Sequence, residues 1–435
     1  MISSPAFSGK RYAVLGLARS GLATVRSLLA SGAAVTAWDQ KEEARAQVPA
    51  AGAGEDLVLA DPLAIDLSGY DGIVVSPGIP LNRHPIAEKA RQAGVPVIGD
   101  IELFALARPS LPPHKVVGIT GTNGKSTTTA LLHHILKSAG VPSLMGGNIG
   151  LPILAQEPLP EGGVYVLELS SYQIDITFSL DCEVAVLLNV TPDHLDRYDS
   201  FEAYRDSKSR LFEMQSAGHA ALIGEDDPVA AEVADDLVRS ERRAGVRRFR
   251  RNAIPDLSGS PALQGPHNAQ NAAAAAMAAE ALGIPAEAIA EGLRTYPGLP
   301  HRMELVGERN GIRFVNDSKA TNPDSAAPAL AAYPAIHWIL GGLPKSDDLG
   351  PCTAHLDHVR AAYTIGEAGP TFARLLKSRI PVIECERLTE AVRRAAGAAA
   401  PGEVVLLSPA CASFDQFRDY EARGEAFRAA VEALA

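Results

Sequence analysis

The sequence is poor in the features that mark secreted and membrane-spanning proteins. Only four of its 435 residues are cysteines, Cys182, Cys352, Cys385 and Cys411, and no CxxC pair occurs. We therefore expect reduced, buried thiols and neither disulfides nor a zinc site. Every apolar run is interrupted well short of the ~20 residues that a membrane helix needs, and the first ten residues lack the basic and apolar regions of a signal peptide. The chain is predicted to be cytoplasmic, without a membrane partner.

Positive charge is also scarce. Lys and Arg number 40 against 51 Asp and Glu, which gives a formal net charge of −11. Nucleic acid is not expected as a partner, because phosphate backbones favour basic surfaces, and an anionic ligand must meet local positive groups. A chain of this length is expected to form two or three domains with separate apolar cores. We expect a monomer that binds small molecules.

Short apolar strands alternate with helices along the whole chain, which is the pattern of a parallel α/β fold. The proline-bearing stretches 108–113 (RPSLPP) and 296–300 (YPGLP) interrupt this pattern, and we expect the first to be an extended connector. The sequence thus predicts three α/β domains, at residues 1–108, 109–298 and 299–435. Strands are expected at 12–15, 34–38, 73–75, 95–98, 115–120, 164–168, 184–189, 313–316, 337–340, 361–365 and 404–407, and helices at 21–30, 86–93, 126–139 and 269–282.

A glycine-rich loop stands between a predicted strand and a predicted helix. Residues 118–126 read GITGTNGKS, and the backbone N–H groups of such a loop can face phosphates at the helix N-terminus. Lys125 would reach the β- and γ-phosphates of a nucleotide, and the Ser126 or Thr127 hydroxyl would join a Mg²⁺ shell. The strict G-x-x-x-x-G-K-[ST] string is not met, because Ile119 replaces its first glycine. The alternative is a glycine-rich turn before an amphipathic helix.

The string GITGTNGKST resembles the nucleotide loop of the Mur ligase and folylpolyglutamate synthetase superfamily. Further strings in all three segments are similar to the same family: GGNIG (146–150), LELSSYQ (167–173), LNVTPDHLDRY (188–198), HNAQN (267–271), LPHRME (299–304), NDSKATN (316–322) and SPACASFDQF (408–417). The last two resemble the members that add D-glutamate, and the DNPR signature of the diaminopimelate- or lysine-adding members is absent.

The resemblance implies a fold and an activity. The outer domains are expected to be Rossmann-like, around a central P-loop-type ATPase domain with a mostly parallel sheet. The implied enzyme is an ADP-forming acid–D-amino-acid ligase of peptidoglycan synthesis. It would activate UDP-N-acetylmuramoyl-L-alanine as an acyl phosphate with ATP and Mg²⁺, and then join it to D-glutamate.

Two residues outside the loop are candidates for metal binding. Glu168 ends one predicted strand and His194 follows another, so both are expected at the carboxyl edge of a parallel sheet. A carboxylate suits Mg²⁺, whereas an imidazole is a less usual ligand for this ion. The resemblance assigns both residues to metal.

The resemblance also implies roles for the residues that match family motifs. Lys208, which read alone is an exposed helical lysine, matches a lysine carried as an N-carboxylated Mg²⁺ ligand. Asn268, which read alone is a helix cap, is assigned to ATP together with Asn271. The implied catalytic residues are Lys125, His194 and Lys208, and two Mg²⁺ ions would be held by Ser126, Glu168, His194 and carboxylated Lys208. The implied ATP site comprises Gly121, Thr122, Asn123, Gly124, Lys125, Ser126, Thr127, Asn268, Asn271, Arg302 and Asp317.

The two substrates that are to be joined are expected to bind mainly to the outer domains. Residues 16–21 resemble a dinucleotide fingerprint whose middle glycine is replaced by Ala18, and Asp39 ends the next strand, where a ribose-binding acid would sit. Taken alone, this is a weak NAD signal. D-Glutamate carries two carboxylates, which call for cationic and hydroxyl donors. The resemblance assigns Ser20, Asp39, Ser76, Gly78 and Asn148 to the UDP-linked substrate, and Lys319, Thr321, Lys345, Ser413 and Tyr420 to D-glutamate.

Three alternatives stay open at this point. The first is another Mur ligase or a folylpolyglutamate synthetase. The second is an NAD-dependent oxidoreductase built on the first domain, against which the missing middle glycine counts. The third is a P-loop switch or binding module that hydrolyses ATP without needing an amino acid.

Overall fold

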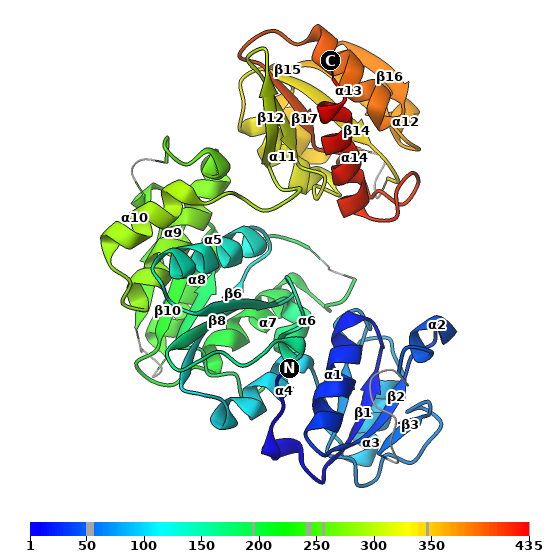
Figure 1. Ribbon diagram of the computed structural model, residues 1–435, viewed down its shortest axis with the longest axis vertical. Coiled ribbons are helices and arrows are strands. Elements are labelled where there is room, and N and C mark those ends of the chain that lie inside the picture. Colours follow the sequence, from blue (N-terminus) through cyan, green and yellow to red (C-terminus); the bar gives the residue numbers. More distant parts are fainter. Residues whose placement is uncertain (49–55, 194–195, 241–244, 255–256, 345–347, 435) are drawn as a thin grey trace. The chain divides into compact units, whose positions relative to one another are not determined.

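Three α/β sheets form the fold, as the ribbon of the computed structural model shows in Figure 1. The structure describes residues 1–48, 56–193, 196–240, 245–254, 257–344 and 348–434. The chain divides into two compact units, Met1–Pro255 with Gln270–Leu293 and Asp256–Ala269 with Arg294–Ala435. The first unit contains two of the sheets, and the second unit contains the third.

The N-terminal sheet is entirely parallel, with the order β3-β2-β1-β4-β5. Its helices arise from standard signals: α3 ends at Gly94, which takes the left-handed conformation (φ 67°) that ends helices without steric strain. Because β1 lies between β2 and β4, the loops after all three strands meet at one edge. The elements are β1 (Arg11–Leu15), α1 (Arg19–Ala30), β2 (Ala34–Trp38), α2 (Glu42–Arg45), β3 (Leu57–Leu59), β4 (Gly72–Val75), α3 (Ile86–Ala93), β5 (Val97–Ile98) and α4 (Asp100–Ala107).

The central sheet is also parallel, with the order β11-β10-β9-β6-β8-β7. Its inner strands β8 and β9 are buried at every residue, as expected for a sheet covered on both faces. The strands are β6 (His114–Thr120), β7 (Ser143–Gly147), β8 (Gly163–Glu168), β9 (Val184–Leu187), β10 (Ala220–Gly224) and β11 (Val246–Phe249). The helices are α5 (Lys125–Ser138), α6 (Ser171–Asp175), α7 (Phe201–Glu213), α8 (Pro228–Arg239), α9 (Pro266–Ala281) and α10 (Ala286–Thr295).

The C-terminal sheet has the order β12-β13-β17-β14-β15-β16, in which only β12 is antiparallel to its neighbour. Two apolar clusters cover its faces: Val315 and Leu340 belong to one, and Phe314 and Ile339 to the other. The strands are β12 (Glu304–Arg309), β13 (Ile312–Asn316), β14 (Ile336–Gly341), β15 (Val359–Ile365), β16 (Val382–Glu386) and β17 (Val404–Leu407). The helices are α11 (Pro323–Ala331), α12 (Gly369–Leu376), α13 (Leu388–Ala398) and α14 (Tyr420–Glu432).

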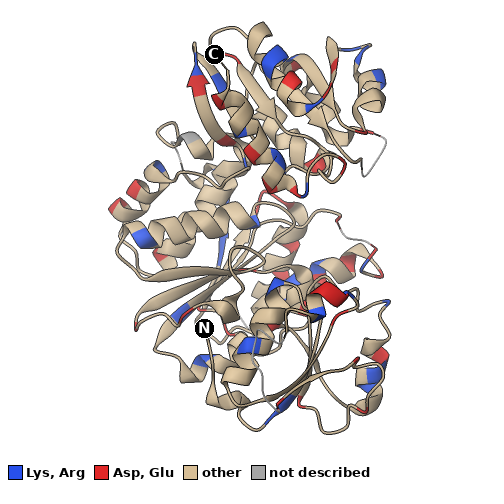
Figure 2. Ribbon diagram, turned by 45° about the vertical axis from the view of Figure 1, so that its right-hand side comes forward, with Lys and Arg blue, Asp and Glu red and all other residues tan. Residues whose placement is uncertain are grey.

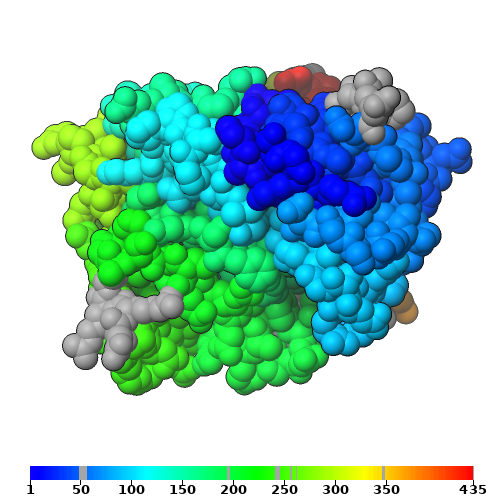
Figure 3. All heavy atoms as spheres, turned by 90° about the horizontal axis from the view of Figure 1, so that it is seen from below, coloured from blue at the N-terminus to red at the C-terminus, as the bar shows by residue number. Residues whose placement is uncertain are grey.

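The first residues of the chain pack against the central part of the first unit. Ile2 and Phe7 are fully buried in the same apolar cluster as Leu154, and the Ile2 N–H donates to the Leu154 carbonyl at 3.1 Å. Figure 3 shows this dark blue segment against the cyan residues that follow the N-terminal sheet. Shared burial of this kind links the first two sheets.

The predicted strands and helices are present in the described chain, with ends shifted by up to three residues. The expected extended connector is wrong in its first half, because Arg108–Ser110 forms a 3-10 turn. Proline at the second position of a helical turn leaves no hydrogen bond unmade, since that N–H has no partner in any case. All four cysteines are free and buried, as predicted.

Lys and Arg residues are interspersed with Asp and Glu residues along the ribbon (Figure 2). Arginines in and directly after β11 pair with acidic neighbours: Arg248 pairs with Glu225 and Asp235, and Arg250 pairs with Glu225. The positive charges of these arginines are therefore balanced by neighbouring carboxylates. None of the helices in the described part of the chain has the length and hydropathy that a bilayer crossing requires.

A buried carboxylate on α4 gives the first testable prediction. Glu102 is only 5% exposed and accepts hydrogen bonds from the Phe178 N–H (2.6 Å), the Ser179 N–H (3.0 Å) and the Ser179 hydroxyl (2.7 Å). We expect Glu102→Ala to lower the free energy of unfolding by about 2–4 kcal/mol, because these donors lose a charged acceptor. Urea denaturation measures the change.

The matched control is Glu157→Ala. Glu157 is 89% exposed and pairs only with the N-terminal amine in the described structure, so its loss should change the unfolding free energy by less than about 0.5 kcal/mol. Equal effects of the two substitutions would show that the Glu102 contacts do not stabilise the unit.

Candidate active site

The predicted phosphate loop lies between β6 and α5, and its conformation requires glycine. Gly121 and Gly124 have φ angles of 147° and 87°, and a Cβ on Gly124 would lie 2.2 Å from the Asn271 side-chain oxygen. The loop is also tied to the segment after β9, because the Thr122 N–H donates to the Asn189 carbonyl at 2.9 Å and the Asn123 N–H to the Asn189 Oδ1 at 2.8 Å. The loop is thus held open at the N-terminus of α5, where a phosphate is favoured.

Two lysines meet at this loop. Lys125 Nζ donates to the carbonyls of Gly121 and Thr122, both at 2.8 Å, and Lys208 Nζ donates to the same Gly121 carbonyl at 3.2 Å. The interpretation of Lys208 as an exposed helical lysine is wrong, because its side chain is 1% exposed and its Nζ lies 4.4 Å from the ring centroid of Tyr204. Burial, and then the charge of Lys125, hold the pKa of Lys208 well below its usual value.

Glu168 lies beside the loop, at the end of β8. It pairs with Ile119 of the neighbouring β6 and is 3% exposed. Its Oε1 accepts a hydrogen bond from Asn148 Nδ2 at 3.2 Å, whereas its buried Oε2 has no hydrogen-bond partner among the described residues. A buried carboxylate oxygen with spare acceptor capacity fits a hard cation such as Mg²⁺. The buried Ser126 hydroxyl, in the first turn of α5, supplies a second oxygen of the kind that Mg²⁺ binds.

Two residues that were not predicted from the sequence, Asn189 and Tyr204, contact the phosphate loop. Asn189 closes a reciprocal pair, since its Nδ2 also donates to the Asn123 carbonyl at 3.2 Å, and the Tyr204 hydroxyl lies 3.2 Å from Thr122 Oγ1. The signal for Asn189 was its position just after an apolar strand, within LNVTPDHLDRY. Tyr204 had no comparable signal.

The two predicted asparagines of α9 have different surroundings. Asn271 is buried, and its Oδ1 accepts a hydrogen bond from the Thr128 hydroxyl at 3.3 Å, so it lies at the first turn of α5. Asn268 is also buried, and its Nδ2 donates to the Gln264 carbonyl at 3.1 Å. The cap interpretation of Asn268 is wrong, because α9 already starts at Pro266.

In the N-terminal sheet, the predicted substrate residues organise the loop after β1. Asp39 accepts hydrogen bonds from the Leu17 N–H at 2.7 Å and the Lys41 N–H at 2.9 Å. The Ser76 hydroxyl donates to the Gly16 carbonyl at 2.9 Å. The strand-end loops therefore converge at one edge, as the parallel order predicts.

The remaining predicted substrate residues lie on neighbouring elements of the same unit. Ser20 is half-buried in the first turn of α1, and the Gly78 carbonyl accepts a hydrogen bond from Arg197 at 3.1 Å. Asn148 lies against Glu168 through both its backbone and its side chain. Asn148, a predicted contact of the UDP-linked substrate, therefore lies against the carboxylate that is predicted to bind metal.

In the second unit, Asp317 follows β13 and lies beside the end of β17. It is 7% exposed and accepts hydrogen bonds from the Ser408 hydroxyl at 2.8 Å and the Met303 N–H at 3.3 Å. Burial raises its pKa to about 7, although these hydrogen bonds and the charge of Arg302 act in the opposite direction. Arg302 and Asp317, predicted together for ATP, are thus electrostatic neighbours.

Three of the predicted D-glutamate residues, Lys319, Ser413 and Tyr420, belong to segments that meet at the start of α14. Lys319 Nζ lies 3.7 Å from the ring centroid of Tyr420. Ser413 is buried and follows Cys411 and Ala412, whose carbonyls accept hydrogen bonds from the fully buried Arg423. Arg423 also donates to Ser318, next to Lys319, so one guanidinium holds both segments.

The remaining predicted site residues are Thr321, His194 and Lys345. Thr321 is half-buried and directly precedes Asn322, which caps α11 through its side chain. His194 and Lys345 lie outside the described residues.

A glycine-rich loop with a lysine at a helix start, beside a strand-end carboxylate in a parallel sheet, defines a P-loop-type nucleotide-binding protein of three α/β domains. Three family profiles match the chain: a Mur ligase MurD-like N-terminal domain at residues 10–99, a Mur ligase middle domain at 119–253 and a Mur ligase glutamate ligase domain at 301–411. The chain belongs to the Mur ligase family, which uses ATP and Mg²⁺.

Full-length relatives and solved structures agree with this assignment. The chain is 63% identical over 434 residues to a protein of Novosphingobium aromaticivorans, covering 100% of this chain and 97% of that protein. It is 58% identical over 446 residues to a protein of Zymomonas mobilis, covering both fully. Both carry the name UDP-N-acetylmuramoylalanine--D-glutamate ligase.

Among solved structures, UDP-N-acetylmuramate-alanine ligase from Thermotoga maritima superposes with a TM-score of 0.60 at 18% identity, over 98% of this chain and 99% of that chain. A bifunctional folylpolyglutamate synthase/dihydrofolate synthase from Yersinia pestis gives a TM-score of 0.54 at 20% identity, over 81% and 98% of the two chains. These likenesses show the shared fold.

The raised pKa of Asp317 gives a prediction about stability and pH. The folded protein holds a proton on Asp317 up to about pH 7, whereas the unfolded chain releases it near pH 4. The stability due to this protonation is therefore full below about pH 4 and is lost as the pH rises through 7. We expect Asp317→Asn to be more stable than the parent by about 2–4 kcal/mol at pH 8, with a smaller difference at pH 5.

Denaturant unfolding at the two pH values tests this expectation. Asp66→Asn is the control: Asp66 is exposed, and hydrogen bonds from Ser68 lower its pKa, so it is ionised in both states throughout this range. A stability difference for Asp317→Asn that stays constant from pH 5 to pH 8 would mean that this carboxyl titrates normally.

Proposed function

We propose that this chain ligates D-glutamate to UDP-N-acetylmuramoyl-L-alanine at the expense of ATP, in the cytoplasmic stage of peptidoglycan synthesis, releasing ADP and phosphate. Support for the substrates comes from the full-length relatives that carry this activity in their names. The observation that carries the chemistry is the convergence of Lys125 and Lys208 on the Gly121 carbonyl, at a loop that lies beside Glu168. The Oε2 of Glu168 has no hydrogen-bond partner among the residues that the structure describes. Such a site can hold phosphate and cation together.

The reaction follows from the charges that meet at the loop. A carboxylate oxygen of the UDP-linked substrate attacks the γ-phosphorus of ATP, and the bond to the ADP oxygen breaks. The two anions repel each other, so the loop N–H groups and the Lys125 ammonium must neutralise the phosphates. The amine of D-glutamate then attacks the acyl carbon, loses a proton and expels inorganic phosphate, which leaves an amide.

We assign two Mg²⁺ ions to Ser126, Glu168, His194 and a carboxylated Lys208. Bound Mg²⁺ would supply positive charge between the triphosphate and the substrate carboxylate. The lowered pKa of Lys208 supports the carboxylation, because only a neutral amine adds to CO₂. The neutral amine forms an N–C bond with CO₂ and releases one proton, which leaves an anionic oxygen ligand in place of the amine.

The remaining assignments extend this proposal to the outer domains. We divide the chain into a UDP-substrate domain at 1–108, an ATP domain at 109–298 and an amino-acid domain at 299–435, acting as a cytoplasmic monomer. The ATP contacts are the loop residues Gly121–Thr127 with Asn268, Asn271, Arg302 and Asp317. The UDP-linked substrate contacts Ser20, Asp39, Ser76, Gly78 and Asn148, and D-glutamate contacts Lys319, Thr321, Lys345, Ser413 and Tyr420.

Phosphate release with UDP-N-acetylmuramoyl-L-alanine and a panel of D- and L-amino acids tests the function. We expect robust turnover with D-glutamate alone, and a loss of about 10²–10³-fold in kcat for Lys125→Ala, because the phosphates lose a positioned cation. The control is Lys137→Ala, an exposed lysine in the last turn of the same helix, which should match the parent. Equal turnover with L-lysine or L-alanine would reject the specificity, and ATP hydrolysis without any amino acid would favour a P-loop switch.

Chemical rescue tests the carboxylated lysine. We expect Lys208→Ala to lose at least about 100-fold in kcat and to regain part of it with acetate or formate, whose oxygens replace the lost anion. Lys125→Ala is the control and should not respond, since a carboxylate cannot replace a cation. If the parent enzyme incorporates no labelled CO₂ and neither variant is rescued, Lys208 acts as an amine.

A further inference from the structure

The second unit contains a strained turn directly before β12. His301 has a φ of 61° and Met303 a φ of 48°, values that side-chain-bearing residues rarely adopt. Arg302 stands between them and closes the turn through a hydrogen bond from its N–H to the Leu299 carbonyl at 3.2 Å. Such a conformation persists only where surrounding contacts hold it.

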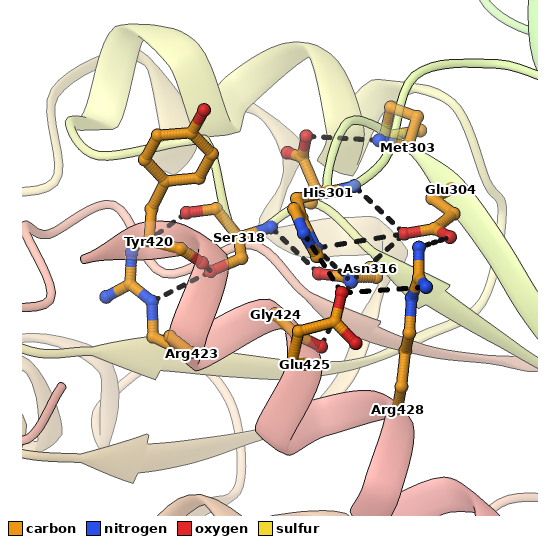
Figure 4. Close-up of polar contacts among 11 residues, drawn as sticks. His301, Met303, Glu304, Asn316, Ser318, Tyr420, Arg423, Gly424, Glu425 and Arg428 are labelled. Atoms are coloured by element: carbon orange, nitrogen blue, oxygen red, sulfur yellow. Dashed lines mark hydrogen bonds and ion pairs between the residues drawn. The ribbon is translucent and has the colours of Figure 1, made fainter. Parts of the chain in front are cut away.

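The carboxylate of Glu304 supplies those contacts, as Figure 4 shows. Its Oε2 accepts the His301 N–H at 2.9 Å and the Asn316 Nδ2 at 3.2 Å. Its Oε1 accepts the Arg428 guanidinium, from α14. One oxygen therefore holds the turn against the end of β13, and the other forms an ion pair with a helix.

The ring of His301 is held by the same neighbours. Asn316 Nδ2 donates to His301 Nδ1 at 2.9 Å, which leaves His301 Nε2 facing Glu425 at 3.4 Å. A Cβ on Gly424 would lie 2.1 Å from His301 Nδ1, so α14 approaches the ring only because this residue is glycine. The turn is thus packed against Glu304 of β12, Asn316 of β13 and the Gly424–Glu425 segment of α14.

The turn also contacts both proposed ligand sites of the unit. The Met303 N–H donates to Asp317 Oδ1 at 3.3 Å, and the His301 carbonyl accepts the Lys319 N–H at 3.0 Å. Asp317 belongs to the proposed ATP contacts, and Lys319 to the proposed D-glutamate contacts. A change in the turn would therefore shift Arg302 and both of these residues.

We propose that Glu304 is a positioning residue for the ligation: its Oε2 holds the strained 301–303 turn so that Arg302 is presented to ATP beside Asp317. This inference rests on the proposed function of Arg302 and Asp317. Glu304 itself need not touch a substrate, because it acts through the backbone of the turn. The ion pair from its Oε1 to Arg428 stabilises the fold without fixing the turn.

Steady-state kinetics of matched variants separates the two oxygens. Glu304→Ala removes the contacts of both carboxylate oxygens. We expect its KM for ATP to rise about 10-fold with a smaller change in kcat, because a misplaced Arg302 weakens nucleotide binding. Arg428→Gln removes the ion pairs of Arg428 with Glu304 and Glu425 and leaves the hydrogen bonds of Glu304 Oε2 in place, so its Tm should fall while its KM for ATP stays within about 2-fold of the parent. Glu304→Gln, which keeps a carbonyl oxygen for the turn, should restore most of the ATP affinity.

The result that overturns the proposal is a KM for ATP within about 2-fold of the parent for folded Glu304→Ala. Should that variant not fold, Glu304→Asp takes its place, since it keeps the charge but is one methylene shorter. An increase of about 3-fold or more in its KM for ATP is then expected, and an unchanged KM contradicts the proposal.

A double-mutant cycle with Arg302→Ala distinguishes the failure of this proposal from that of the proposed function. If Glu304 acts through Arg302, then Glu304→Ala adds little to the KM for ATP in the Arg302→Ala background. A full additive effect shows that Glu304 acts by another route. If Arg302→Ala raises the KM and Glu304→Ala does not, only the positioning role fails, whereas no effect of Arg302→Ala rejects the ATP contact itself and the positioning role with it.

Discussion

Two lysine amines donate to one carbonyl oxygen, that of Gly121, and the central site depends on this arrangement. Like charges this close repel each other, so burial and the neighbouring ammonium both favour a neutral Lys208. The positive φ of Gly121 and Gly124 allows the loop to turn back so that its carbonyls face the lysines. The same turn leaves the loop N–H groups at the start of α5, where anions bind.

All three sheets bring polar residues together at the edge where their parallel strands end. Parallel strands end at the same edge, so residues far apart in the sequence become neighbours there. Asp39 and Ser76 hold the loop after β1, Glu168 lies beside the phosphate loop, and Asp317 lies beside Ser408. Each domain thus presents polar side chains at a strand-end edge while its sheet provides the apolar core.

The C-terminal unit adds a different constraint, because its proposed ligand site lies next to a strained turn. A left-handed conformation at His301 and Met303 is unfavourable, and the structure offsets it with the Glu304 carboxylate and the Asn316 amide. Arg423 acts similarly on the segments that carry Lys319 and Ser413. Buried polar groups with several hydrogen bonds are suited to this role, because moving any one of them leaves others unpaired.

Local sequence determined the strands, the helices and the phosphate loop, because periodicity, glycine and proline act over a few residues. It also placed Glu168 at the end of a strand of the central sheet. In the N-terminal domain, it placed Asp39 at the end of the strand that follows the loop at residues 16–21. Tertiary structure alone decided that Lys208 is buried against Tyr204, that Asn189 closes the loop, and that Arg108–Ser110 turns instead of extending. Burial and long-range hydrogen bonds depend on which elements become neighbours. A helical lysine carries no local signal of its burial, and the position of Asn189 after an apolar strand does not tell which residues it will contact. The same holds for Glu304, whose role arises only where β12, β13 and α14 meet.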